Sequence, residues 1–203
     1  MNKKNKITII GMGYIGLPLA VEFSKYYKVI GYDINKKKIR EINNNHKFKF
    51  EITNSINLIK DSNIYIVAVP TPVFKNNKPD LKPLINASKL ISKILKKNDL
   101  VIYESTVYPG TTDDLLIPIL ENYSKLKINV DFHCGYSPER LNPGSKFDDL
   151  KKIVKVTSGS NNFATNKVDK LYKKIIKIGT HKTSSIKVAE AAKVIENCQR
   201  DLN

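Results

Sequence analysis

Three glycines near the N-terminus are spaced as G-x-G-x-x-G and could bind a phosphate. Gly11, Gly13 and Gly16 follow a short β-branched apolar run at residues 7–10 and precede residues that favour a helix. This order predicts a strand, a tight turn and a helix whose N-terminus points at an anion. Gly11 is expected to make the turn, Gly13 to let a pyrophosphate approach the backbone, and Gly16 to let helix and strand pack closely. The residues expected to contact a dinucleotide here are Gly11, Gly13, Tyr14, Ile15 and Gly16.

An acidic residue follows the second predicted strand. Asp33 comes directly after residues 29–32 and lies 22 residues after Gly11. In dinucleotide-binding folds, an acid at about this spacing accepts hydrogen bonds from the ribose hydroxyls. A carboxylate there also repels a 2′-phosphate, so the sequence predicts NAD rather than NADP as the cofactor. Three lysines at positions 36–38 could instead hold that phosphate; the alternative is that they form the solvated first turn of the next helix.

Further polar turns follow the later predicted strands. They lie at residues 70–72, 104–112 and 135–144 and contain hydroxyls, prolines and acids. In open α/β sheets, ligands bind beyond the carboxyl ends of the strands. These turns are therefore expected to meet the Gly-rich turn at one edge of the sheet, where they could hold a nicotinamide ribose, a water and a sugar.

Hydrophobic patterning predicts the elements that position these turns. Nearly continuous apolar runs indicate buried strands, and apolar residues at helical spacing indicate helices between them. Their alternation predicts an α/β fold with a parallel, doubly wound sheet. Pro118 is expected to kink its helix. Strands are expected at residues 7–10, 29–32, 64–69, 100–103, 128–130 running toward 134–136, and 153–156, and helices after Gly16 and at 36–42, 81–95, 112–123, 163–176 and 185–203.

The composition is that of an ordinary globular protein with a basic surface. The 203 residues are 41% apolar and 27% charged, with a formal net charge of +16. No apolar run approaches the roughly 18 residues of a membrane span and no signal-peptide pattern is present, so we expect a cytoplasmic chain with no membrane partner. The lysines are scattered and arginines are few, which argues against nucleic-acid binding. A basic surface could still attract an anionic substrate such as a nucleotide sugar.

Cysteine and histidine spacing indicates neither a disulfide framework nor a metal site. Cys134 and Cys198 lack zinc-ligand spacing and are both expected to be reduced, buried side chains. His46, His133 and His181 also lack ligand spacing and are expected to be structural.

Taken together, several stretches resemble the UDP-glucose/GDP-mannose dehydrogenase family. Glu-Ser-Thr-Val-Tyr-Pro-Gly at 104–110 and Tyr-Ser-Pro-Glu-Arg-Leu-Asn-Pro-Gly at 136–144 are specific to this family in a way that the Gly-rich turn is not. The likeness is greatest to the branch that oxidises UDP-N-acetylhexosamines, because Pro143 stands where glucose-oxidising relatives usually carry a second acid. Ser145 departs from the Asp usual in that branch. The matching stretches are 11–20, 69–72, 104–112, 135–144, 179–182 and 188–203.

The resemblance implies a four-electron oxidation of the sugar C6 alcohol to a carboxylate by two NAD⁺ in turn. An aldehyde would be trapped on a cysteine as a thiohemiacetal, oxidised to a thioester and hydrolysed. Thr106 would position a water near C6, and Glu139 would act as base or direct that water. Lys193 and Asn197, four residues apart on one helical face, would stabilise the developing oxyanion. The resemblance also assigns cofactor contacts to Pro70, Thr71 and Thr106, and substrate contacts to Glu139, Arg140, Asn142, Lys193 and Asn197.

Each catalytic assignment has a structural alternative. Thr106 could merely shape a turn, and Glu139 could be an exposed loop acid or the partner of Arg140. Lys193 and Glu196 could be ordinary charges on a helix surface. A different NAD-dependent hydroxyacid dehydrogenase would need a Lys or His base, for which the sequence offers no convincing candidate.

The family's nucleophilic cysteine lies further on, in a Gly-rich loop of a second half, and no such loop occurs in these 203 residues. Neither Cys134 nor Cys198 has Gly-rich surroundings like those of that nucleophile. Residues 1–182 are expected to form an NAD-binding domain, and 183–203 the start of a central helix through which the full chain would form a homodimer. We therefore expect NAD binding without completed oxidation; the alternative is a truncated, inactive dinucleotide-binding module.

Overall fold

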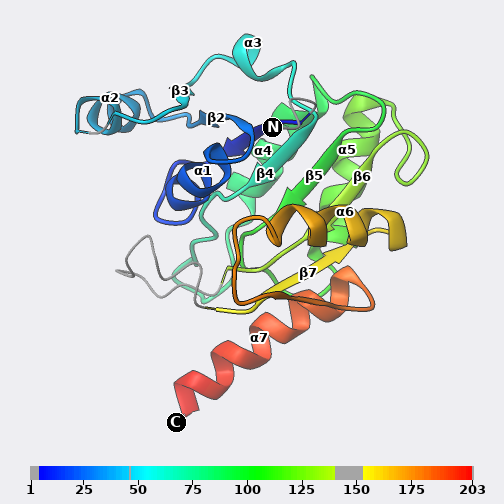
Figure 1. The fold of residues 1–203 in the computed structure, drawn as a ribbon. Helices are drawn as coiled ribbons and strands as arrows, with labels where there is room; N and C mark the ends of the chain where they lie inside the picture. Colours follow the sequence, from blue (N-terminus) through cyan, green and yellow to red (C-terminus); the bar gives the residue numbers. More distant parts are fainter. Residues whose placement is uncertain (1–4, 46, 140–152, 203) are drawn as a thin grey trace.

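One eight-stranded sheet forms the centre of the structure (Figure 1). The computed structural model describes residues 5–45, 47–139 and 153–202. The strand order is β3-β2-β1-β4-β5-β6-β7-β8. The strands are β1 (Lys6–Ile10), β2 (Lys28–Tyr32), β3 (Glu51–Thr53), β4 (Ile64–Val67), β5 (Leu100–Tyr103), β6 (His133–Tyr136), β7 (Lys155–Gly159) and β8 (Thr180–Lys182). The helices are α1 (Gly16–Ser24), α2 (Lys36–Asn45), α3 (Ile56–Ile59), α4 (Lys82–Ser92), η1 (Thr111–Leu116), α5 (Ile117–Ser124), α6 (Asn162–Tyr172) and α7 (Ile186–Leu202).

The predicted α/β fold is confirmed, with one change in strand direction. Strands β1 to β6 pair in parallel, and so do β7 and β8. Strand β7 pairs antiparallel with β6, with Gly135 opposite Gly159 and Tyr136 opposite Ser158. The sheet is therefore mostly parallel, as predicted, with the pair β6–β7 as the exception. A buried apolar strand has the same local pattern in either direction, so the sequence did not indicate the reversal.

Two apolar clusters cover the two faces of the sheet. Ile9 packs in a cluster with Phe23 of α1 and Tyr172 of α6. Ile10 points to the other face, where its cluster includes Leu84 of α4 and residues of α5 and α7. Helices on both faces explain why the central strands are apolar at nearly every position. Within the ranges described, no helix is long and apolar enough to cross a membrane.

Several predicted boundaries shift because local geometry overrides the apolar pattern. The strand expected to run from 128 toward 136 begins only at His133: Ile128 forms an isolated bridge with Phe132, and Asn129 has a left-handed φ of 62°. The helix expected at 112–123 begins as the π-helix η1. Pro118 then lies in the first turn of α5, where its missing N–H is tolerated.

Three short elements, β3, α3 and β8, were not predicted. Each has three or four residues, which is too few for periodicity to reveal. The other differences are at element ends: β7 begins at Lys155 rather than residue 153, and α6 ends at Tyr172 rather than residue 176.

Candidate functional site

The Gly-rich turn joins β1 to α1 in a conformation that excludes side chains at two of its three glycines. Gly11 has a φ of 96°, and a Cβ there would lie 2.7 Å from the carbonyl oxygen of Ala68. A Cβ on Gly16 would lie 1.8 Å from the carbonyl oxygen of Gly11. A Cβ on Gly13 would meet nothing nearer than Lys38 Nζ, at 3.9 Å. Gly11 and Gly16 are therefore required by the turn itself, whereas Gly13 leaves open space above the backbone.

Asp33 lies directly beside this turn. Its Oδ2 accepts hydrogen bonds from the N–H of Met12 at 2.9 Å and from Lys38 Nζ at 3.0 Å, and its Oδ1 accepts from the N–H of Asn35 at 2.9 Å. Burial opposes ionisation of Asp33, but these hydrogen bonds outweigh it and hold the pKa of the carboxyl below its usual value. The side chain is thus an anionic acceptor fixed at the edge of the turn.

The lysines at 36–38 differ in their surroundings. Lys38 pairs with Asp33, while Lys36 and Lys37 are exposed in the first turn of α2, as the solvated alternative predicted. The open backbone at Gly13, the N-terminus of α1 and the fixed carboxylate of Asp33 together fit a dinucleotide: pyrophosphate over the turn and ribose hydroxyls on the acid.

The turns after β4 and β5 are joined to each other. Thr71 Oγ1 donates to the carbonyl oxygen of Thr106 at 2.9 Å, and Ser105 Oγ donates to that of Val69 at 2.6 Å. Pro70 and the side chain of Thr106 are exposed. Both segments therefore form one surface beyond the carboxyl ends of neighbouring strands, where the sequence placed the cofactor contacts.

Glu139 is not an exposed loop acid. It follows β6, is only 5% exposed, and donates its N–H to the carbonyl oxygen of Glu104 at 3.3 Å. Its Oε2 lies 3.6 Å from Nζ of Lys155, the first residue of β7. Arg140 and Asn142, predicted substrate contacts, lie outside the described residues.

A buried acid that the sequence analysis did not assign lies next to Glu139. Glu104 is fully buried, accepts a 2.6 Å hydrogen bond from Lys155 Nζ, and accepts another from the hydroxyl of Tyr172. Burial raises the pKa of Glu104 to about 7, with Glu139 acting in the same direction and the Lys155 ammonium acting against it. The sequence feature that could have indicated this cluster is Lys155, a charged residue within the otherwise apolar run at 153–156.

Helix α7 carries the two predicted oxyanion residues and packs against η1, β6 and β7. Lys193 is 6% exposed, so it is not an ordinary surface charge, and Asn197 is half-buried. One turn earlier, the Glu190 carboxylate accepts the N–H of Gly110 at 2.6 Å and the N–H of Thr112 at 2.9 Å. Glu190 thus ties α7 to the turn that follows Thr106.

The cysteines differ from each other in exposure. Cys134 is fully buried, as expected, and burial raises the pKa of its thiol far above the usual range. Cys198 is exposed, so the expectation that it is buried was wrong. It lies beyond the part of α7 that packs against the sheet. His133 is buried against the ring of Phe163, whereas His46 lies outside the described residues.

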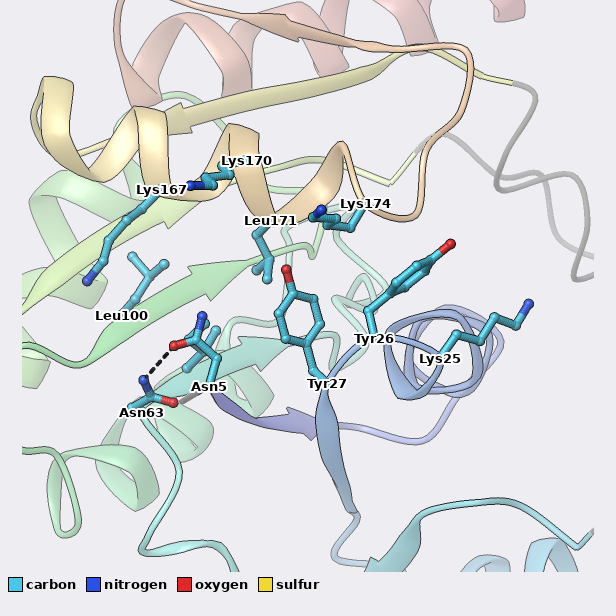
Figure 2. Close-up of a pocket in the computed structure, with 11 residues that line it drawn as sticks. Asn5, Lys25, Tyr26, Tyr27, Asn63, Leu100, Lys167, Lys170, Leu171 and Lys174 are labelled. Atoms are coloured by element: carbon cyan, nitrogen blue, oxygen red, sulfur yellow. Dashed lines mark hydrogen bonds between the residues drawn. The ribbon is translucent and has the colours of Figure 1, made fainter. Parts of the chain in front are cut away.

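Figure 2 shows a hollow lined by residues from both ends of the described chain. It has a volume of ≈ 680 Å³ and includes Ile64 and Leu100, the first residues of β4 and β5. It therefore lies at the amino ends of the strands, away from the Gly-rich turn. No predicted site residue lines it, and we do not assign it to the cofactor. Its other lining residues are Asn5, Lys25, Tyr26, Tyr27, Asn63, Lys167, Lys170, Leu171 and Lys174.

Comparison with known proteins agrees with this geometry. The model of the UDP-glucose/GDP-mannose dehydrogenase family, NAD binding domain, matches residues 5–51 and 44–176. The chain belongs to this family. A UDP-N-acetyl-D-glucosamine 6-dehydrogenase of Pseudomonas aeruginosa is 50% identical over 214 residues, which cover 99% of this chain and 51% of the relative. Protein CapL of Staphylococcus aureus is 47% identical, over 97% of this chain and 49% of its own length.

Solved structures of the family show the same fold. The UDP-D-ManNAc dehydrogenase of Pyrococcus horikoshii superposes with a TM-score of 0.90 at 34% identity, over 97% of this chain and 50% of that one. The chain spans about half the length of the relatives it matches, and their matching half is N-terminal. It corresponds to the N-terminal, NAD-binding half of these relatives.

Proposed function

We propose that this chain serves in the oxidation of the C6 alcohol of a UDP-N-acetylhexosamine to a uronate with two NAD. The observation that carries the proposal is the burial of two charged side chains, Glu139 just after β6 and Lys193 on α7. A surface role for either residue is excluded by its burial. The printed name of the 50%-identical relative, a UDP-N-acetyl-D-glucosamine 6-dehydrogenase, supports this substrate class.

The cofactor site would involve residues on the first two strands. Gly13 leaves room for the pyrophosphate, and Asp33 would accept the ribose hydroxyls. Pro70, Thr71 and Thr106 would contact the nicotinamide half, with Tyr14 and Ile15 over the turn. NAD, when bound, supplies the hydride acceptor of the reaction.

The remaining residues would act on the sugar. Thr106, exposed beyond β5, would hold a water near C6. Glu139 would take the proton from that water or from the C6 hydroxyl, and its low exposure favours a poised base over a solvated one. Lys193 and Asn197 would donate to the oxygen on which negative charge develops. The nucleophile would come from outside these 203 residues.

We also propose that residues 1–182 form the NAD-binding domain and that 183–203 begin a central dimerisation helix. The supporting observation is the apolar exposure along α7: Val188 is 46%, Ile195 58% and Leu202 86% exposed. Apolar side chains left in water over several turns of one helix favour burial against a partner. Light scattering on a longer gene product would test for a homodimer.

The decisive experiment is to read the gene through codon 203 and to assay the product with UDP-N-acetylglucosamine and NAD. A continuous frame that encodes a cysteine in a Gly-rich loop, and two NADH formed per sugar, would support the proposal. In that enzyme, Glu139→Gln should lower NADH formation at least tenfold. Unchanged NADH formation would remove Glu139 from the mechanism, and a stop at this codon would favour an inactive dinucleotide-binding module.

A further inference from the structure

The ammonium of Lys155 joins three segments around Glu139. Lys155 is 3% exposed. Its Nζ donates to Glu104 Oε2 at 2.6 Å, to the carbonyl oxygen of Pro138 at 2.9 Å and to that of Ser137 at 3.3 Å. An ammonium has three donors, and all three are directed at these acceptors. Two of the acceptors belong to the residues immediately before Glu139.

The same cation faces two buried carboxylates. Lys155 Nζ is 2.6 Å from Glu104 Oε2 and 3.6 Å from Glu139 Oε2. The Tyr172 hydroxyl donates to the other oxygen of Glu104, and its ring lies 5.4 Å from the ammonium. Two buried carboxylates that lie beside one another repel each other, and a cation between them offsets that repulsion. Lys155 supplies that charge.

Backbone hydrogen bonds and one hydroxyl also hold the segment that carries Glu139. The N–H of Ser137 donates to the carbonyl oxygen of Tyr103 at 2.9 Å, and its hydroxyl donates to that of Val156 at 2.7 Å. The N–H of Glu139 donates to the backbone carbonyl oxygen of Glu104 at 3.3 Å. These bonds fix the path of the chain along β5 and β7. Lys155 in addition attracts the Glu139 carboxylate from the start of β7.

We infer that Lys155 is the positioning residue of Glu139: its ammonium holds the carbonyls of Ser137 and Pro138 and draws the Glu139 carboxylate toward the end of β7. The inference rests on the proposed function only for the role of Glu139 in the reaction. The placement of Glu139 by Lys155 is a property of the folded chain and can be measured without cofactor or substrate.

A purely structural role predicts something different. If Lys155 only neutralises Glu104, removing both charges together should restore the segment as well as the fold. The double variant Glu104→Gln with Lys155→Met leaves no unpaired Glu104 anion, yet it still lacks the donors to Ser137 and Pro138. It therefore separates the two roles even where Lys155→Met alone fails to fold.

The test is amide hydrogen exchange, followed by NMR, in the 203-residue chain. We expect the Glu139 N–H of the double variant to exchange at least tenfold faster than in the parent, with the N–H of Ile66 in the core unchanged. Lys155→Arg, which keeps a buried cation with several donors, should recover most of the protection. Lys170→Met, at an exposed lysine of α6, is the matched control and should change nothing.

Parent-like exchange at Glu139 in the double variant would overturn the inference, and so would a failure of Lys155→Arg to recover protection. NAD affinity within twofold of the parent would show that each variant retains its first strands and turns. Loss of sugar oxidation in the longer enzyme, with the exchange pattern as expected, would instead count against the proposed function alone.

Discussion

The N–H of Met12 donates a 2.9 Å hydrogen bond to Asp33 Oδ2, which joins the Gly-rich turn to the acid at the end of β2. The two features that the sequence predicted for a dinucleotide site are thus one hydrogen-bonded unit. Lys38 completes it from α2. A change at Asp33 should therefore affect the turn and the cofactor together.

Asp33→Asn should weaken NAD binding by roughly 10- to 100-fold, since charged hydrogen bonds to the ribose are each worth about 1.5–3 kcal/mol. The ratio of the NADP to the NAD dissociation constant should fall as well, because the repelling charge is gone. Isothermal titration with both cofactors measures this. Asp61→Asn, at an exposed acid, is the control. An unchanged NAD constant in Asp33→Asn would contradict the assigned role.

Two single-methyl changes in the same turn should have opposite consequences. Gly11→Ala requires a side chain at a φ of 96° and 2.7 Å from a carbonyl oxygen, so it should destabilise the fold by at least about 1–3 kcal/mol. Gly13→Ala has room in the folded chain, so it should leave the melting temperature within a few degrees and weaken NAD binding. Calorimetry and NAD titration on the pair check both statements. If NAD bound Gly13→Ala as tightly as the parent, the cofactor would not approach this backbone.

Glu190 should be important for the stability of α7 on the sheet. Its carboxylate accepts two backbone N–H groups, and a Gln side chain offers one acceptor oxygen, so Glu190→Gln leaves one donor without a partner. We expect a loss of about 1–3 kcal/mol of unfolding free energy, measured in urea. Glu41→Gln, at an exposed acid of α2, is the comparison. Equal midpoints for the two variants would argue against the link between α7 and the turn.

His133 should make stability depend on pH. Burial, and secondarily Lys167, lower its pKa in the folded state. Between that lowered pKa and the usual value of about 6.5, the unfolded chain binds more protons, so stability rises with pH and is lost on acidification. His133→Gln should reduce the difference in unfolding free energy between pH 7.5 and pH 5. The exposed His181→Gln should leave it as in the parent, and a parent-like difference in His133→Gln would refute the prediction.

The two cysteines should react at very different rates. Cys134 is fully buried with a raised pKa, and Cys198 is exposed. Ellman's reagent should therefore titrate one thiol in the native chain and two in guanidinium chloride. Modification of Cys198 should leave NAD binding unchanged, because none of the proposed cofactor contacts lies on α7. Two fast native thiols would show that β6 is not buried as described.

The parts of the site that the sequence predicted are those set by local spacing. Gly11, Gly16 and Asp33 belong to one strand–turn–helix–strand unit whose geometry follows from residue type. The Lys155 cluster could not be predicted in this way, because its members are far apart in the sequence. Glu104 lies 51 residues before Lys155, and Tyr172 belongs to α6, which follows β7 in the chain. Its partners depend on the antiparallel pairing of β6 and β7, which no local pattern indicated.

The most direct test of the central claim is an NMR titration of the 203-residue chain with NAD. We expect saturable one-to-one binding, with the largest shift changes at the amides of Met12, Gly13 and Asp33, then at Thr71 and Thr106, and weaker binding of NADP. Absence of saturation, or shifts confined to the lysine-lined hollow at the amino ends of the strands, would contradict this expectation.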